Sequence, residues 1–279
     1  MTAVVVAAQT RAIVHRTRGS TNGPITRLVS PSGLGELLKP FVFLDLFALN
    51  PSSGHKGFGM HPHSGIATVT FLNEGDVGYE DTTGKKGTLH AGSVEWMRAG
   101  NGVWHTSGAL GNSPVHGFQL WVALPLAEEN ATAQSLYLAA SQVPMDGPAQ
   151  VLLGEYGSAR SVIPAPPSIN YLAVRLKDRE RWTYAPPAGH VVAWVAVNEG
   201  GLQASGLIAT GELAVFEESG EAIDFVARGE TAFVLGSAVK HPHELVTGNY
   251  SVHTSKRALE QGEAEIRRIG ARLRQEGRL

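Results

Sequence analysis

The sequence contains no cysteine. Disulfide bonds and thiolate ligands are therefore excluded, and any metal site must be built from histidine and carboxylate side chains. An excess of positive charge is also missing, because 23 Lys and Arg stand against 25 Asp and Glu, which gives a formal net charge of −2. We therefore expect neither a nucleic acid nor an anionic membrane as a partner.

A long hydrophobic run is missing as well. The apolar start of MTAVVVAAQTRAIVH has no positive charge before it and is ended by Arg11, so it is too short to span a bilayer and lacks the pattern of a secretory signal. The 279 residues are 43% apolar and 17% charged, which is typical of a soluble globular protein with one large or two ordinary domains. We expect a cytoplasmic protein.

Short strands dominate the pattern that is present. Glycine (33 residues) and proline (15 residues) are spread through the chain and mark turns between segments that are rich in β-branched and aromatic residues. These segments are 67–72, 93–97, 116–124, 171–176, 190–197, 213–219 and 231–236. Turn sequences such as NEGD (73–76) and NEGG (198–201) separate them. Strands at this spacing predict an all-β sandwich or barrel.

A linker is predicted near residues 128–146, where the strand pattern breaks. Each side of it has a run of short strands and a late hairpin bounded by glycine, so we predict two β-domains, residues 1–135 and 136–279. Direct sequence repetition is too weak to demonstrate a duplication. The first strand and the final helix are candidates for packing on the opposite domain, which leaves the boundaries soft.

One helix is predicted at about residues 255–276, where the apolar side chains share one face. That face consists of Leu259, Ile266, Ile269 and Leu273. Thr254 or Ser255 can cap its start, and acidic residues come early and arginines late, as the helix dipole favours. A packing role explains this helix fully.

Two histidines stand two residues apart in GFGMHPHSGIATVTF (57–71). Residues i and i+2 of a strand point to one face, so His61 and His63 converge on a common point, where imidazole is a frequent metal ligand. The segment AGSVEWMRAGNGVWHTSGAL (91–110) is predicted as a strand, a glycine-rich turn and a second strand, which delivers His105 across a barrel. An HxH pair followed by a distant histidine is the metal arrangement of cupin barrels.

The chain resembles the pirins and pirin-like bicupins in three signature blocks: GFGMHPHSGIATVTFLNEG, EDTTGKKGTLHAGSVEWMRAGNGVWHTSG and PVHGFQLWVALP. FVFLDLF (41–47) is similar to the family's first core strand, and residues 249–273 resemble its closing strand and helix. The resemblance implies two cupin barrels packed face to face, with one metal in the N-terminal barrel held by His61, His63 and His105. Pirin-like proteins are associated with iron, some of them with oxygenation of the flavonol quercetin and others with regulatory binding.

Two positions depart from the family's pattern. Pirins place a glutamate ligand two residues after the third histidine, where this chain has Ser107, and a second glutamate four residues after the HxH pair, where it has Ala67. Three interpretations follow. The three histidines hold the metal alone, or another carboxylate such as Glu95 completes the shell, or the site has degenerated and binds metal weakly or not at all.

The resemblance implies one divalent ion as cofactor, Fe(II) first, with Ni, Cu, Zn and Mn as alternatives. The leading hypothesis is a metal-dependent, oxygen-using oxidoreductase of the quercetin 2,3-dioxygenase type, acting on a small aromatic or flavonol-like ligand. The alternative is a non-catalytic regulatory or ligand-binding protein with a protein partner and a weak or absent metal site.

The remaining histidines are assigned no catalytic role. His116 is expected to be a buried, hydrogen-bonded residue, and His55 and His90 are expected to be solvated because they fall in turn-like contexts. A second HxH pair, His241 and His243, falls in an expected loop, so a second metal site there is the less favoured interpretation.

Overall fold

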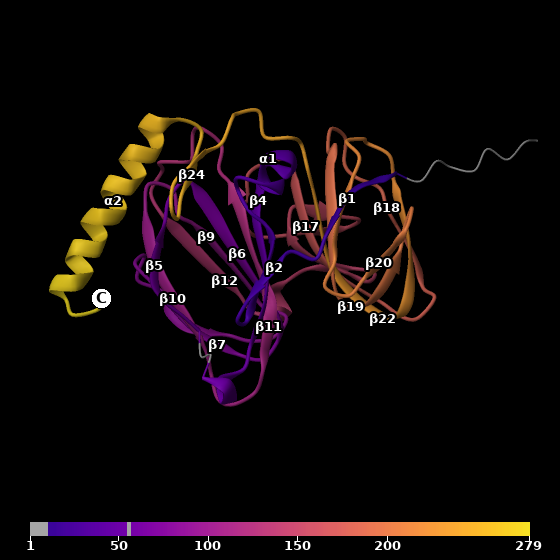
Figure 1. The fold of residues 1–279 in the computed structure, drawn as a ribbon, viewed down its shortest axis with the longest axis horizontal. Coiled ribbons are helices and arrows are strands. Elements are labelled where there is room, and N and C mark those ends of the chain that lie inside the picture. Colours follow the sequence, from indigo (N-terminus) through magenta and orange to yellow (C-terminus); the bar gives the residue numbers. More distant parts are fainter. Residues whose placement is uncertain (1–10, 55–56) are drawn as a thin grey trace, which may run out of the picture.

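The computed structural model describes residues 11–54 and 57–279. The start of the chain and His55 lie outside these residues, so the expectations about them stay untested. Two β-barrels stand side by side, and the helix α2 (Lys256–Gln275) runs along the outer side of the N-terminal barrel (Figure 1). The prediction of an all-β fold with a C-terminal helix is confirmed.

Two antiparallel sheets form the N-terminal barrel. The first has the strand order β12-β9-β6-β11-β4-β3-β2, and the second has the order β5-β10-β7-β8. The strands of the first sheet are β2 (Ser20–Asn22), β3 (Ile25–Val29), β4 (Phe41–Leu49), β6 (Ile66–Glu74), β9 (Val94–Arg98), β11 (Val115–Ala123) and β12 (Gln134–Leu138). Those of the second are β5 (Gly57–His63), β7 (Val77–Asp81), β8 (Lys86–Leu89) and β10 (Val103–Ala109). A short helix, α1 (Leu34–Leu38), precedes β4.

A nine-stranded sheet forms the C-terminal barrel, with the order β1-β21-β19-β22-β17-β14-β13, while β18 pairs with β22 and β20 with β19. Its strands are β1 (Ile13–Thr17), β13 (Met145–Asp146), β14 (Ala149–Leu153), β17 (Ile169–Leu176), β18 (Arg181–Tyr184), β19 (Val192–Gln203), β20 (Leu207–Ala209), β21 (Leu213–Phe216) and β22 (Ile223–Ala238). Two small hairpins complete the fold, β15 (Glu155–Tyr156) with β16 (Ala159–Arg160), and β23 (Val246–Thr247) with β24 (Val252–His253). Among the described residues, no helix combines the length and the hydropathy that crossing a bilayer requires.

The two barrels exchange their chain ends. The N-terminal strand β1 pairs with β21 of the C-terminal barrel, whereas α2 packs against β10 of the N-terminal barrel. In between, β12 pairs with β9 and β13 pairs with β14, so the chain passes from one barrel to the other between residues 138 and 145. This crossing falls inside the predicted linker.

An apolar layer joins the barrels. On antiparallel strands, alternate side chains point to opposite faces, and one face of each large sheet contributes to this layer. From β6 come Ala67, Val69 and Phe71, and from β19 come Val192, Trp194 and Ala196. Phe41 and Trp194 meet edge to face across it, with ring centroids 5.4 Å apart.

The interiors of the two barrels differ in polarity. One continuous apolar cluster fills the C-terminal barrel. In the N-terminal barrel the apolar residues form two clusters, one around Met97 and Trp121 and the other around Phe47 and Leu72. A belt of polar side chains occupies the strand positions between these clusters, and we call it the polar belt. It consists of Asp45, Thr68, Thr70, Glu95 and Gln119.

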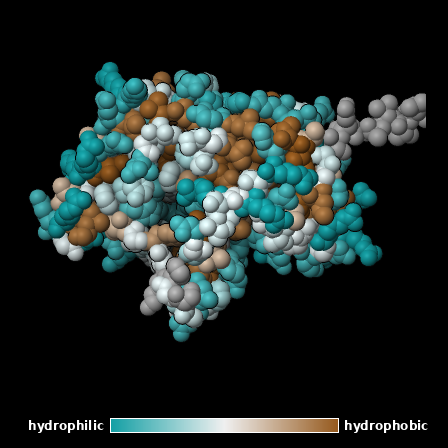
Figure 2. Space-filling model, viewed as in Figure 1, coloured by the Kyte–Doolittle hydropathy of each residue, from teal (hydrophilic) through white to brown (hydrophobic). Residues whose placement is uncertain are grey.

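The helix α2 begins where the sequence predicts, because the hydroxyl of Ser255 accepts a hydrogen bond from the Ala258 amide at 3.2 Å. Its outer side is mainly hydrophilic (Figure 2). Its inner side contacts Trp104 of β10, whose indole N–H donates to the carbonyl of Ile266 at 2.9 Å. The helix therefore covers the outer face of the strands that carry the histidines.

A buried hydrogen-bonded cluster holds the chain before α2 on the N-terminal barrel. The hydroxyl of Ser64 lies 2.8 Å from that of Ser251 and 2.9 Å from Nε2 of His253. Nδ1 of His253 lies 3.3 Å from the carboxylate of Glu129, which also accepts two hydrogen bonds from Thr254. All but Thr254 are at most 2% exposed, so they fix this segment rather than meet a ligand.

Gly262 of α2 packs directly on this cluster. A methyl group there would lie 2.5 Å from Oγ of Ser64 and 2.8 Å from Nε2 of His253. Alanine is favoured over glycine in a helix by about 1 kcal/mol, but overpacking costs about 1–3 kcal/mol. We expect Gly262→Ala to lower the free energy of unfolding in urea, despite the better helix former. Ala264→Gly, on the exposed side, measures the propensity alone, and a stability gain for Gly262→Ala would contradict the close packing.

Candidate metal centre

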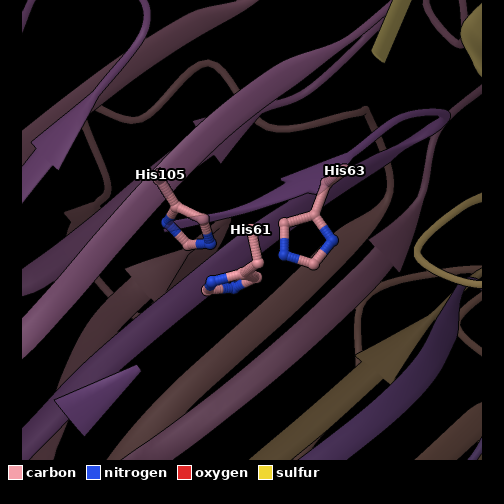
Figure 3. A group of neighbouring side chains, drawn as sticks. All are labelled: His61, His63 and His105. Carbon is pink, nitrogen blue, oxygen red and sulfur yellow. The ribbon is translucent and has the colours of Figure 1, made fainter. Parts of the chain in front are cut away.

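The pairing of β5 with β10 brings the predicted histidines together. His61 stands directly opposite His105, and His63 stands opposite Val103 at the end of the same ladder. The imidazoles gather on one side of the two strands (Figure 3). One ring nitrogen from each of the three lies within 4.8 Å of the others, and this is the only such group of histidine and carboxylate side chains in residues 11–54 and 57–279.

Each imidazole has an acceptor beside its Nδ1 atom. His61 Nδ1 lies 2.7 Å from the carbonyl of Gly59, and His63 Nδ1 lies 3.1 Å from the carbonyl of Tyr250. His105 Nδ1 lies 3.5 Å from the carboxylate of Glu95. An acceptor at Nδ1 favours the tautomer with the proton on that atom, which leaves the lone pair of Nε2 free for a metal.

Burial favours the neutral form of two of the three rings. Burial lowers the pKa of His61 to about 4, with a further contribution from the neighbouring His105. Burial also lowers the pKa of His63 well below its usual value, again helped by the other two rings. The Nε2 atom of His105 is buried without a hydrogen-bond partner in the described chain. Three converging imidazoles, one of them with an unpaired inner nitrogen, fit a divalent transition metal.

Glu95 approaches the cluster from outside it. Its side chain is 6% exposed, accepts a hydrogen bond from the hydroxyl of Thr70, and faces Nδ1 of His105. Glu95 therefore contacts the Nδ1 side of His105 and does not belong to the group of converging ligand atoms, which consists of the three histidines. Carboxylate–histidine pairs of this kind orient the ring and raise its basicity as a ligand. Of the three interpretations, the one that places Glu95 in the metal shell is not the arrangement seen here.

The side chains at the two positions that depart from the family's pattern, 107 and 67, lie on different faces of their sheets. Ser107 follows His105 by two residues on β10 and pairs with Tyr79 in an unbroken register with β7, so it shares the face of His105. Ala67 belongs to the apolar layer between the barrels and is fully buried there. A side chain at position 67 therefore faces away from the histidines, and of the two positions only 107 lies on their side.

An aromatic wall stands beside the cluster. The ring of Trp121 lies 4.9 Å from that of His63 and stacks on Phe43, with centroids 4.0 Å apart and planes 6° apart. The guanidinium of Arg27 covers the Phe43 ring at 3.9 Å and pairs with Asp45. On the other side, the half-exposed ring of Tyr250 lies 6.2 Å from His63. The cluster therefore lies between a flat apolar wall and the surface.

The sequence did not point to every one of these groups. Glu95 was a named candidate, but the carbonyl of Tyr250 was not, because a backbone oxygen 187 residues from His63 leaves no signal in a motif. Trp121 and Phe43 were recognised only as strand residues. Their shared inward face becomes visible only once the register between β11 and β4 is known.

The other histidines take other roles. His116 was expected to be buried, and this prediction is wrong, because its exposed ring pairs with Glu74 at 3.1 Å on the surface. His90 is exposed, as predicted. His241 is buried and uses both nitrogens, Nε2 toward the carbonyl of Leu124 at 3.2 Å and Nδ1 toward the amide of His243 at 3.3 Å. With both nitrogens engaged, His241 serves the fold.

Comparison with known proteins identifies the family. Residues 24–122 match the Pirin family model. A protein of Pseudomonas aeruginosa that carries the provisional name of a quercetin 2,3-dioxygenase is 31% identical over 277 residues, which cover 91% of this chain and 95% of that protein. This chain belongs to the pirin family. Two pirin-like proteins of Arabidopsis thaliana are 37% and 39% identical over 110 residues, so the matches cover 39% and 33% of those relatives.

Solved structures agree on the fold. A quercetin 2,3-dioxygenase from Acinetobacter baumannii superimposes with a TM-score of 0.84 and 23% identity, covering 93% of this pirin and 98% of that chain. The nickel(II) complex of the Escherichia coli pirin YhhW superimposes with a TM-score of 0.65 and 20% identity, covering 83% and 98%. The predicted pair of cupin barrels is thereby confirmed. The predicted metal ligands stay a prediction, for which the geometry of the cluster is favourable.

The contact between Glu95 and His105 leads to a test. We expect Glu95→Gln to weaken Fe(II) or Ni(II) binding by about 10–100-fold, because the ring loses the anionic partner that raises its basicity. Competition with a chelator of known affinity measures the change. Glu74→Gln removes the exposed partner of His116 and serves as the matched control. Equal metal affinity in both variants would contradict the supporting role of Glu95.

Proposed function

We propose that this pirin is a metal-dependent, oxygen-using enzyme of the quercetin 2,3-dioxygenase type, acting on a small aromatic substrate with acidic hydroxyl groups. The observation that carries the proposal is the set of three converging imidazoles. Nδ1 of His61 and of His63 lies at hydrogen-bond distance from a carbonyl, and Nδ1 of His105 faces the Glu95 carboxylate, which favours Nε2 as the metal-binding atom. The name of the Pseudomonas aeruginosa relative supports a dioxygenase activity, and the nickel(II) bound by the Escherichia coli pirin supports a metal site.

In this proposal His61, His63 and His105 hold one divalent ion, Fe(II) first and Ni(II) as the main alternative. When bound, such a metal supplies a redox centre that activates dioxygen and a deprotonated phenolic substrate toward each other. The carbonyls of Gly59 and Tyr250 keep two of the rings in the ligating tautomer. Glu95 does the same for His105 and places one negative charge just outside the site.

The charge of the site favours an anionic substrate. Three neutral imidazoles leave the charge of a divalent ion uncompensated, and Ser107 adds none where other pirins carry a glutamate. The flat wall of Trp121 and Phe43 beside His63 is suited to stacking an aromatic ring. A hydroxylated aromatic compound that loses a proton on binding meets both conditions.

One observation favours a second candidate, a regulatory or ligand-binding pirin without turnover. Ser107 stands at the one inward position where the family places its carboxylate ligand, so the metal has no anionic oxygen in its immediate shell. Weak metal binding would then leave the barrel as a ligand pocket. The two candidates differ in whether loss of the metal also abolishes the protein's activity.

The first experiment measures metal and turnover together. We expect untagged protein to bind one redox metal per chain and to consume oxygen with quercetin, and His63→Ala to lose both. His116→Ala, an exposed histidine outside the cluster, should keep both. Absence of metal in the wild type after anaerobic reconstitution with Fe(II) would overturn the proposal and favour the regulatory candidate.

A gain-of-ligand variant tests the absent carboxylate directly. We expect Ser107→Glu to tighten Fe(II) binding by at least ~10-fold, because it adds an anionic oxygen on the face of His105, and ions of this kind prefer such ligands. Ala67→Glu is the contrasting variant, since that side chain faces the apolar layer and should destabilise the fold without strengthening metal binding. Tighter binding in Ala67→Glu than in Ser107→Glu would contradict the assignment of the two faces.

A further inference from the structure

Thr70 lies in the middle of the polar belt. The strand β6 pairs with β9 on one side and with β11 on the other, so Thr70 stands opposite Glu95 of β9 and opposite Gln119 of β11. Its hydroxyl contacts the carboxylate of Glu95 and lies 2.9 Å from the amide oxygen of Gln119. Side chains that stand directly opposite each other on antiparallel strands are close enough to bond. The three residues therefore form one polar row across three adjacent strands.

The row ends at the candidate metal centre. One carboxylate oxygen of Glu95, Oε2, accepts a hydrogen bond from Thr70, and the other, Oε1, lies 3.5 Å from Nδ1 of His105. This second contact crosses the barrel, because β9 belongs to the first sheet and β10 to the second. The hydroxyl of Thr70 is therefore linked to the ring of His105 through a single carboxylate.

The bond from Thr70 holds the Glu95 carboxylate in one orientation. The terminal torsion of a glutamate side chain is broad, so the side chain by itself does not fix the plane of its carboxylate. The contact with His105, at 3.5 Å, is longer than an ordinary hydrogen bond, which makes it sensitive to that plane. A donor fixed on Oε2 keeps Oε1 turned toward His105. Thr70 is thus placed to orient the histidine through Glu95.

The hydroxyl of Thr70 has one proton and two neighbours. A hydroxyl donates once but accepts more than once, whereas a carboxylate only accepts. When Thr70 donates to Glu95, its contact with Gln119 is a hydrogen bond only if the amide nitrogen of Gln119 faces Thr70.

The amide of Gln119 has a reason to take this orientation. The oxygen and nitrogen ends of an amide have nearly the same shape, and with the oxygen toward Thr70 the nitrogen is buried without a partner in the described chain. Turning the amide over removes this unpaired N–H, and a buried carbonyl without a partner is tolerated more often than a buried N–H. Gln119 then donates to Thr70, and the row has one direction from Gln119 to His105.

The same strand carries a second threonine without such partners. Thr68 stands two residues before Thr70 on the same face of β6. Its cross-strand neighbours are Met97 of β9 and Trp121 of β11. It is fully buried, and its hydroxyl oxygen has no hydrogen-bond partner within residues 11–54 and 57–279. The two threonines share a strand and a face and differ in their partners, so they form a matched pair.

We propose that Thr70 and Gln119 are positioning residues for the metal centre: Gln119 donates to Thr70, Thr70 donates to Glu95, and the oriented carboxylate holds Nδ1 of His105. The inference rests on the proposed function, because it requires that the three histidines bind a metal. Its consequence is that metal affinity depends on two side chains that form no hydrogen bond with a histidine in the described chain.

The test measures the affinity of the full-length protein for Ni(II) by competition with a chelator. We expect Thr70→Val, which keeps the shape and removes the hydroxyl, to weaken binding by at least ~5-fold, because the loss of an outer partner of a ligand histidine has effects of this order. Thr70→Ser restores the hydroxyl and should bind Ni(II) as the wild type does. Thr68→Val removes the hydroxyl that has no partner and should leave the affinity unchanged.

A double-mutant cycle separates positioning from a general effect on the fold. If Thr70 acts through Glu95, the variant with both Thr70→Val and Glu95→Gln binds Ni(II) no more weakly than Glu95→Gln alone, since residues that act in one chain are not additive. Additive losses would overturn the proposal. Urea unfolding of the metal-free variants establishes that each is folded. Gln119→Met removes the donor to Thr70 without touching β6, and it should weaken binding in the same direction.

Unchanged affinity in Thr70→Val or in Gln119→Met, an equal loss in Thr68→Val, or failure of Thr70→Ser to restore binding would each contradict the positioning role. With normal Ni(II) binding in the wild type, these results would overturn this inference alone and leave the metal centre in place. Absence of Ni(II) binding in the wild type would overturn the proposed function and the inference together. The two failures are therefore distinguished by the wild-type titration.

Discussion

The register between β5 and β10 is the constraint on which the candidate metal centre depends. It sets His61 opposite His105, although the two residues are 44 positions apart in the sequence. A slip by one residue would turn one set of imidazoles to the opposite face of the sheet. The helix α2 and the buried cluster around His253 hold this edge in place, since Trp104 on the outer face of β10 is bonded to the helix. Packing on the outer face of these strands therefore helps to keep the histidines together.

The polar belt distinguishes the interior of the N-terminal barrel from that of the C-terminal barrel. On β4 the inward residues run Phe43, Asp45, Phe47, so an acidic side chain interrupts an apolar stripe in the middle of the barrel. Buried polar groups are stable only when they are bonded to one another, and Thr70 and Glu95 satisfy this condition beside His105. The C-terminal barrel has a continuous apolar interior, and the buried polar residues Ser237 and Thr231 of β22 lie opposite the two ends of β17.

Much of this could be read from the sequence. Short alternating segments gave the strands, the capped amphipathic run gave α2 to within one residue at each end, and the HxH pair with His105 gave the cluster. What depended on long-range register could not be read. The inward or outward direction of position 67 is one example, because the family's motif suggested a ligand position and the sheet turns it into the apolar layer. The exposure of His116 is another, since its neighbours in sequence are buried and only its strand face decides.

The exchange of chain ends has a consequence for how the molecule can be divided. The strand β1 lies on the edge of the C-terminal sheet, while the carbonyl of Tyr250, near the other end of the chain, reaches His63 in the N-terminal barrel. A gene fragment that stops after the region typical of the family would encode all three imidazoles but not the oxygen that orients one of them. Cleavage of the connection between residues 138 and 145 would likewise not release two separate bodies, because each part would still hold a terminal segment of the other. Each barrel therefore depends on a terminal segment that lies at the opposite end of the chain.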